Sequence, residues 1–286
     1  ITGIIALFWA VTSGNTFFAS KSPQENLELI KSHGIKAIET SPAKLKDLLD
    51  VAGNHEVTEL KQILVAGSLM TDSLAKQCEQ VFGFVPSYLY GSTEVGAATV
   101  GTFQSDSNNR LGKLVADVDL EIVDEALNSM DPNQVGQIRY RKSSMPDKYW
   151  NSASSHLNGF VDGWFYPGDR GWLDAEGFLY LEGRNDDVVN AAGNKFNLLT
   201  LDLWLQDTAL FDDVASFTYE TPSGSRVGLA FVSANPPEPH ILVQRIQSFL
   251  PNLQIGQLLR LSALPRNKMD KVDRNELSKL AEAKHE

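Results

Sequence analysis

The sequence predicts an α/β protein: a parallel α/β layer, a β-rich subdomain and a small α+β domain toward the C-terminal end. Three observations predict this class. Helix start and stop signals alternate with short apolar strand patterns up to about residue 105, and period-two alternation dominates residues 106–183. Mixed helix and strand patterns fill residues 188–286, and a chain of 286 residues suffices for about two domains.

Composition and charge exclude several classes of protein. Hydrophobic residues make up 42% and charged residues 21%, which argues against a disordered or fibrous chain. The formal net charge of −11 disfavours binding to nucleic acid or to anionic membranes. The longest apolar run, residues 1–11, is too short to span a bilayer. One cysteine, Cys78, excludes an internal disulfide and fits a reducing compartment, so we expect a cytoplasmic protein.

The first region carries clear helix signals. Ser22-Pro23-Gln24-Glu25 combines an N-cap, a proline at the first helical position and a capping-box glutamate, and Gly34 ends that helix. Cys78 lies in the apolar stripe of a later helix, so we interpret it as a packing residue and not as a nucleophile. We expect the other elements of this layer to be a strand at 35–38, a helix from Ser41 to Gly53, a strand at 62–66, a helix from Thr71 to Gly83 and a strand at 87–90.

Two polar loops follow neighbouring strands of this layer. They are Gly67-Ser68-Leu69 and Tyr90-Gly91-Ser92-Thr93-Glu94. Parallel sheets bind ligands beyond the carboxyl ends of their strands, so both loops are candidates for one site. A ring can stack on a base, a hydroxyl or an amide can reach phosphate, and a carboxylate can hold Mg²⁺. The alternative for the second loop is a tight turn, with a capping threonine and a glutamate in the first turn of a helix.

The β-rich region contains a second constellation. Alternation predicts strands at 117–124 and 136–141 and a hairpin over 172–180. Gly168-Asp169 lies just before this hairpin, and Arg184 follows 15 residues after Asp169. A carboxylate at a glycine turn can accept two hydrogen bonds from a ribose diol, and an arginine can reinforce them. A purely structural Asp–Arg pair is the alternative.

The last region ends in a polar loop, residues 265–274, which includes Lys271. A lysine delivered to a reaction centre stabilises developing phosphate charge, whereas the alternative is a solvated basic turn. We expect the elements of this region to be a helix at 200–210, strands near Val214 and Val227, a helix at 240–250, a strand near Leu258 and a terminal helix.

In this order and spacing, the three constellations resemble the adenylate-forming superfamily, which includes acyl-CoA synthetases, peptide-synthetase adenylation domains and luciferases. The resemblance covers nearly the whole chain but only the later half of a family member. The matching segments are 90–94, 166–169, 183–187 with 193–196, and 265–274, and Tyr149-Trp150 is a weaker match.

The resemblance implies an AMP-forming acid–thiol ligase of the acyl-CoA synthetase type. A carboxylic acid attacks the α-phosphate of MgATP to give an acyl-adenylate and pyrophosphate, and coenzyme A then takes the acyl group. One alternative is an adenylation enzyme that loads the phosphopantetheine thiol of a carrier protein. Another is a non-catalytic AMP-binding module.

The resemblance assigns the two N-terminal loops to the nucleotide. It implies that Tyr90 stacks on adenine. Thr93 then contacts the α-phosphate and Glu94 holds Mg²⁺, which makes both catalytic. The other cofactor-binding positions that it implies in these loops are Gly67, Ser68, Gly91 and Ser92.

The later motifs receive complementary roles. The resemblance implies that Asp169 binds both ribose hydroxyls with Arg184 nearby. Lys271 then bridges the substrate carboxylate and the nucleotide oxygens as a catalytic residue. Gly193 belongs to a loop that approaches the thiol tunnel.

The resemblance also implies a domain organisation. Residues 1–183 form the remainder of a large AMP-binding domain, divided into the α/β layer at 1–105 and the β-rich subdomain at 106–183. A hinge at 184–187 contains Asp186, and a mobile lid domain follows at 188–286.

Four departures from the family pattern qualify this assignment. Pro167 replaces a threonine, Asp202 replaces a glutamate, and Asp270 replaces a glycine, so a new carboxylate could hold the Lys271 ammonium. The Ser/Thr/Gly-rich loop that wraps the β- and γ-phosphates has no counterpart. We therefore expect a fragment that keeps the AMP contacts but lacks efficient ATP activation.

Overall fold

The computed structural model describes residues 2–53, 59–105, 109–150, 159–191, 194–208, 210–222, 224–267 and 271–283. The chain forms two compact units, residues 1–181 and 182–286. The predicted α/β class, with a parallel layer, a β-rich region and a C-terminal α+β region, is confirmed.

The helices of the first unit begin and end where local chemistry predicts. The Ser22 side chain accepts a hydrogen bond from the Glu25 amide, the Glu25 carboxylate accepts from the Lys21 amide, and Gly34 adopts a left-handed conformation. The side chains of Ser41 and Thr71 likewise cap the two later helices, because each accepts a hydrogen bond from the backbone amide three residues later. The helices are α1 (Thr2–Thr12), α2 (Pro23–His33), α3 (Pro42–Ala52) and α4 (Asp72–Phe82).

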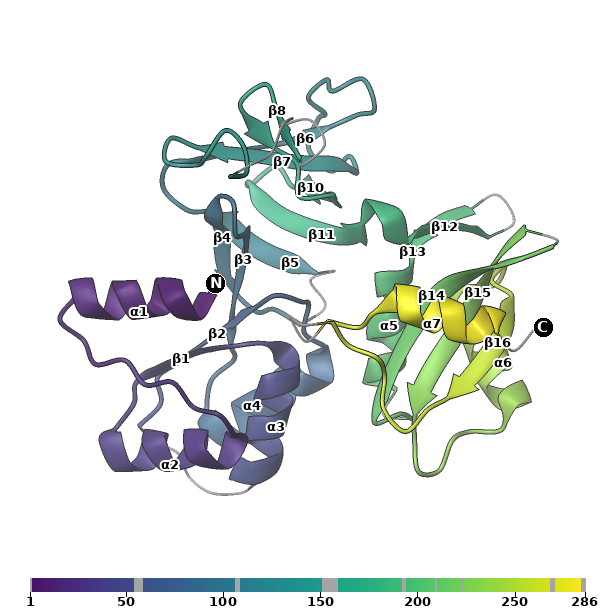
Figure 1. Ribbon diagram of the computed structural model, residues 1–286, viewed down its shortest axis with the longest axis horizontal. Coiled ribbons are helices and arrows are strands. Elements are labelled where there is room, and N and C mark those ends of the chain that lie inside the picture. The colour runs from purple at the N-terminus through teal and green to yellow at the C-terminus, as the bar shows by residue number, and fades with distance from the viewer. Residues whose placement is uncertain are drawn as a thin grey trace. The chain divides into compact units, whose positions relative to one another are not determined.

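Three parallel strands alternate with these helices along the chain and form the sheet of the α/β layer (Figure 1). They are β1 (Ala37–Thr40), β2 (Gln62–Ala66) and β3 (Ser87–Ser92). The first strand begins two residues later than predicted. The carbonyl of Lys36 accepts from the Lys61 and Gln62 amides, and the pairing of β1 with β2 starts only after this contact.

The sheet then continues with antiparallel strands through the β-rich region. The predicted hairpin over 172–180 is confirmed, because β10 and β11 pair and the Asp174 carboxylate accepts from the Glu176 and Phe178 amides in the turn between them. The order beyond β3 is β4 (Gly96–Thr102), β5 (Arg110–Leu114), β11 (Phe178–Arg184), β10 (Asp169–Leu173), β7 (Gly136–Lys142), β9 (Trp164–Phe165) and β8 (Phe160–Val161), with β6 (Val118–Val123) also paired to β7.

The second unit is built on a three-stranded sheet covered on both faces. Two helices pack on one face, around Val214 and Leu229, and α7 packs on the other, around Phe217 and Leu277 (Figure 1). Its elements are η2 (Asn185–Asp187), β12 (Val188–Ala191), β13 (Asn194–Asn197), α5 (Leu198–Asp207), β14 (Asp213–Thr221), β15 (Gly224–Val232), α6 (Pro239–Phe249), β16 (Ile255–Arg260) and α7 (Arg274–Glu282).

Two features of this unit differ from the sequence expectation. The helix predicted at 200–210 begins at Leu198, because the Asn197 side chain caps it through the Leu199 amide. The two-stranded sheet of β12 and β13 was not predicted. Its strands are only four residues long and lack an extended apolar alternation.

A buried carboxylate, Asp202, covers the outer edge of β14. Asp202 Oδ1 accepts from the Ser216 amide at 2.5 Å and from its hydroxyl at 2.6 Å, while the Ser216 carbonyl accepts from Arg274 Nε at 3.0 Å. Arg274 Nη2 in turn lies 2.5 Å from Asp202 Oδ2. The carboxylate and the guanidinium therefore supply the partners that a neighbouring strand would otherwise give to Ser216.

Cys78 is fully buried in α4, which confirms its interpretation as a packing residue. Burial raises the pKa of its thiol to about 12, so the thiol stays protonated and unreactive. No helix within the described ranges is long and apolar enough to cross a membrane.

Replacing Asp202 by Asn should change how stability depends on pH. Burial raises the pKa of the Asp202 carboxyl to about 6, above its ordinary value of 3.8. The stabilisation from protonated Asp202 is thus fully present below pH 3.8 and is lost as the pH rises through 6. Between pH 4.5 and pH 7.5, we expect the free energy of unfolding of the wild type to fall by about 2 kcal/mol relative to Asp202→Asn.

Urea unfolding at the two pH values measures this difference. Asp207→Asn, which alters an exposed carboxylate on the same helix, is the matched control. An equal pH dependence in Asp202→Asn and the wild type would contradict the prediction.

Candidate functional site

The two loops predicted to share a site follow adjacent parallel strands. Gly67 and Ser68 are exposed directly after β2, and the second loop begins within β3, which pairs with β2. The Tyr88 hydroxyl, buried in β3, accepts from the Met70 amide at 2.7 Å and donates to the Met70 carbonyl at 3.1 Å. This double contact fastens the first loop to the strand that carries the second.

The second loop is a tight turn between two antiparallel strands. A Cβ on Gly91 would lie 2.0 Å from the Gly96 carbonyl oxygen, so only glycine fits this close approach. The Ser92 hydroxyl accepts from the Val95 amide, and the Thr93 side chain is exposed at the turn. The alternative of a helix starting here is wrong, because the chain returns as β4 and pairs with β3.

Asp169 meets this loop from a distant part of the sequence. It is the first residue of β10, follows Gly168 with a positive φ of 80°, and is only 9% exposed. The Tyr90 hydroxyl donates to Asp169 Oδ2 at 2.8 Å, across 79 residues of sequence. The predicted adenine-stacking and ribose-binding residues are thus neighbours, with the ring and the carboxylate tied together.

An aromatic chain runs from Tyr90 through the β-rich region. Successive ring centroids lie 5.0 to 6.1 Å apart, with tilted or edge-to-face orientations that aromatic rings favour. The rings of this aromatic chain are, in order, Tyr90, Tyr140, Phe165, Phe160 and Tyr149.

The far end of the aromatic chain contacts Glu94. The Tyr149 hydroxyl donates a hydrogen bond to Glu94 Oε1. Desolvation, reinforced by this bond and by the negative charge of Glu94, raises the pKa of Tyr149 to about 12, so the hydroxyl keeps the proton that it donates. Both ends of the aromatic chain therefore hold a carboxylate predicted to be functional. Sequence reasoning gave Tyr149 no role, and its only signal was the weaker match at 149–150.

The donor set around Glu94 fits a magnesium ion held partly by phosphate. Among the described residues, no group of three His, Cys, Asp or Glu side chains could hold a metal ion. Mg²⁺ is commonly bound by one or two carboxylates together with substrate phosphates and water. A single carboxylate beside a turn is therefore compatible with Mg²⁺ but not with a metal cage made by protein alone.

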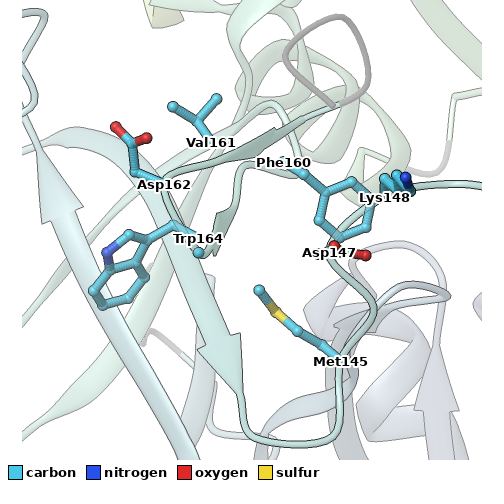
Figure 2. A pocket seen from close by; sticks show the side chains of 8 residues that line it. Met145, Asp147, Lys148, Phe160, Val161, Asp162 and Trp164 are labelled. Atoms are coloured by element: carbon cyan, nitrogen blue, oxygen red, sulfur yellow. The ribbon is translucent and has the colours of Figure 1, made fainter. Parts of the chain in front are cut away.

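A cavity of about 220 Å³ lies elsewhere in the first unit (Figure 2). Apolar and charged side chains line it, and none belongs to a predicted site residue. The lining residues are Met145, Asp147, Lys148, Phe160, Val161, Asp162, Gly163 and Trp164. Phe160 links this cavity to the aromatic chain, because its ring packs against Tyr149.

The remaining predicted residues belong to the second unit. Arg184 ends β11 and is exposed, and Asp186 is exposed in η2. Lys271 is exposed, and its amide donates to Asn267 Oδ1 at 3.1 Å. Gly193 of the predicted thiol-tunnel loop and Asp270, the predicted partner of Lys271, lie outside the described residues.

Relatives with curated functions match almost all of the chain. A 2-succinylbenzoate–CoA ligase of Listeria monocytogenes is 24% identical, over 97% of this chain and 58% of the relative. The 2-succinylbenzoate–CoA ligase of Bacillus subtilis is 26% identical with the same coverage. The chain spans about half the length of the curated relatives that it matches.

Solved structures share the fold. The o-succinylbenzoate CoA synthetase of Bacillus subtilis, in complex with an acyl-adenylate intermediate, gives a TM-score of 0.85 at 24% identity, over 96% of this chain and 58% of that chain. The family model described as AMP-binding enzyme matches residues 1–150, more than half of the chain. The motifs, the fold and this match agree, and the chain belongs to the AMP-binding enzyme family, within the adenylate-forming superfamily.

Proposed function

We propose that the chain is part of an AMP-forming acid–thiol ligase, which activates a carboxylic acid as an acyl-adenylate and transfers the acyl group to coenzyme A. The observation that carries this proposal is the hydrogen bond from Tyr90 to Asp169 beside the carboxyl ends of β2 and β3. Names of relatives support it, because they are 2-succinylbenzoate–CoA ligases and acyl-coenzyme A synthetases.

The first unit would hold the nucleoside part of ATP or AMP. The Tyr90 ring would stack on adenine, and the Asp169 carboxylate would accept hydrogen bonds from both ribose hydroxyls. The Tyr90 hydroxyl keeps one carboxylate oxygen engaged and the carboxylate oriented before the nucleotide arrives. Exposed backbone at the two turns would approach the nucleotide around Gly67, Ser68, Gly91 and Ser92.

The phosphate end would lie at the turn after β3. The exposed Thr93 hydroxyl would contact the α-phosphate, and Glu94 would hold Mg²⁺ together with phosphate oxygens. Bound magnesium would neutralise phosphate charge as the acid attacks. Tyr149 would keep the Glu94 carboxylate oriented toward the metal, since it occupies one of the carboxylate oxygens.

The second unit would act as the mobile lid. Lys271 would stabilise the charge that develops between the attacking carboxylate and the α-phosphate, and Arg184 would lie near the ribose. Asp186 in the hinge at 184–187 would allow the unit to rotate, so that the Gly193 loop can approach the thiol. We assign the large-domain remainder to 1–183 and the lid to 188–286 on this basis.

Coenzyme A is the proposed acceptor, and a carrier-protein phosphopantetheine is the competing one. A panel of fatty, aryl and amino acids in an ATP–pyrophosphate exchange assay would identify the acid. Product formation with coenzyme A alone would support the first acceptor. A cytoplasmic location belongs to the proposal, because a chain with a single cysteine forms no internal disulfide and so fits a reducing compartment.

Asp169→Asn should weaken AMP binding to the 286-residue chain by about 10- to 100-fold, measured by isothermal titration calorimetry. Loss of charge-assisted hydrogen bonds to the ribose costs about 1.5–3 kcal/mol. Asp174→Asn, in the turn of the same hairpin, is the matched control and should bind AMP normally. Equal affinities for wild type and Asp169→Asn would remove Asp169 from the site.

Lys271→Ala should lower carboxylate-dependent ATP–pyrophosphate exchange by about 100- to 1,000-fold, because one positioned charge on the reacting phosphate is lost. The assay uses the longest natural polypeptide that contains this chain, and Lys279→Ala on α7 is the control. If the wild type binds AMP but catalyses no ATP–pyrophosphate exchange with any of the acids, the result would favour the non-catalytic AMP-binding module.

Tyr149→Phe should raise the Mg²⁺ concentration needed for half-maximal exchange by about 10-fold, since second-shell partners contribute roughly this much to metal affinity. The phenylalanine preserves the ring packing against Phe160 and removes only the hydroxyl. Glu94→Gln should raise the requirement further. The control is Tyr180→Phe, which removes a hydroxyl that contacts Asp174 instead of Glu94. If Tyr149→Phe needs the same Mg²⁺ concentration as the wild type, Tyr149 does not have this role.

A further inference from the structure

Residues 265–267 and 271–273 pair with each other and form the base of a hairpin that carries Lys271. The Asp273 amide donates to the Pro265 carbonyl at 2.8 Å, and the Asn267 amide donates to the Lys271 carbonyl at 2.8 Å. Arg266 and Val272 form the bridge between its two sides. The backbone of Lys271 and of the two residues after it is therefore paired with residues 265–267, so the orientation of this paired base sets the orientation of the lysine backbone.

Two arginines attach the base of the hairpin to β14. On one side, Arg266 Nη2 lies 2.6 Å from Asp213 Oδ2. On the other side, Arg274 donates to the Ser216 carbonyl and to the buried Asp202. The first pair is about 30% exposed on both sides, whereas the Asp202 side chain is only 6% exposed. Arg274 thus forms the better-shielded of the two attachments.

Arg274 also reaches the predicted hinge. Its Nη1 lies 3.4 Å from Asp187 Oδ2, and the Asp187 side chain is only 16% exposed. The Asn197 side chain donates to the Arg184 carbonyl at 2.7 Å, on the other side of Asp186. Both flanks of Asp186 are therefore held to the body of the second unit.

We propose that Arg274 is a positioning residue that joins the hinge turn Asn185–Asp187 to the Lys271 hairpin, so that the two segments move as one body. Arg274 contacts Asp187 of the hinge turn and the buried Asp202, and it directly follows Asp273, the last residue of the hairpin. The functional meaning of this coupling rests on the proposed roles of Lys271 and Asp186. When the hinge turn moves, Lys271 would move with it and keep its orientation relative to the rest of the second unit.

Hydrogen exchange followed by mass spectrometry on the 286-residue chain tests the coupling directly. In Arg274→Gln, we expect the amides of 185–188 and those of the hairpin, including Lys271 and Asp273, to exchange about 10-fold faster together. The amides of β15 should keep their wild-type rates. Arg260→Gln is the matched control, because Arg260 binds two carbonyls of the same unit away from the hairpin.

Three outcomes decide the proposal. Joint acceleration of both segments, with β15 unchanged, supports it. Acceleration of the hairpin alone overturns it, because the hinge would then be held independently. Equal acceleration of all segments, including β15, also overturns it, because Arg274 would then merely stabilise the whole unit.

A pH series adds a readout that a general loss of stability does not reproduce. The charged and polar groups that face Asp202 are Arg274 from α7, Asp187 from η2 and Ser216 from β14. The positive charge of Arg274 lowers the pKa of Asp202. By linkage, protonation of Asp202 weakens the Arg274–Asp202 ion pair by the same free energy. Protonation opposes global unfolding, as argued for Asp202 above, but it favours a local opening that loses only Arg274, because the buried carboxyl then has a pKa above 6. After correction for intrinsic rates, exchange through this local opening should rise in both segments together as the pH falls toward 6.

Asp202→Asn should abolish this joint pH step. A step that persists in Asp202→Asn, or one confined to a single segment in the wild type, would overturn the proposal. Exchange rates do not depend on catalysis, so this failure differs from failure of the proposed function. A wild-type polypeptide without ATP–pyrophosphate exchange would overturn the function and leave the coupling intact.

Discussion

The hydrogen bond from the Tyr90 hydroxyl to the Asp169 carboxylate is the contact on which the proposed nucleotide site depends. It joins the end of a parallel strand to the first residue of an antiparallel one, and so links the α/β layer to the β-rich region. Hydrogen bonds to a charged acceptor contribute about 1.5–3 kcal/mol. The aromatic chain behind Tyr90 limits the motion of the ring, so the bond has a defined direction.

The carboxylates of Glu94 and Asp202 are likewise bound by residues that are distant in the sequence. Each carboxylate is held by a group that arrives from a distant part of the chain: Tyr149 for the first, Arg274 for the second. The two differ in exposure. Glu94 is partly exposed and open to a ligand, whereas Asp202 is buried and serves the strand edge of β14. Burying a carboxylate is tolerated there because Ser216 and Arg274 satisfy its oxygens.

Helix positions were predictable because the signals are local. Ser22 and Gly34 bracket α2 through contacts within one turn of the chain, and Asp174 shapes its hairpin in the same way. The strand after Thr93 was not predictable in this way. A threonine and a glutamate after a strand satisfy a helix start equally well, and pairing with the whole of β3 decides between the two.

The sequence by itself determined the order of the helices and parallel strands of the α/β layer, the positions of the polar loops at strand ends and the motifs that identify the family. These depend on hydrophobic period, capping and turn chemistry, all of which act over a few residues. Only the tertiary structure decided that Tyr90 meets Asp169, that Tyr149 holds Glu94, and that Arg274 joins Asp187 to Asp202. These contacts close long loops in the sequence, and their partners are selected by packing and burial, which no local pattern encodes.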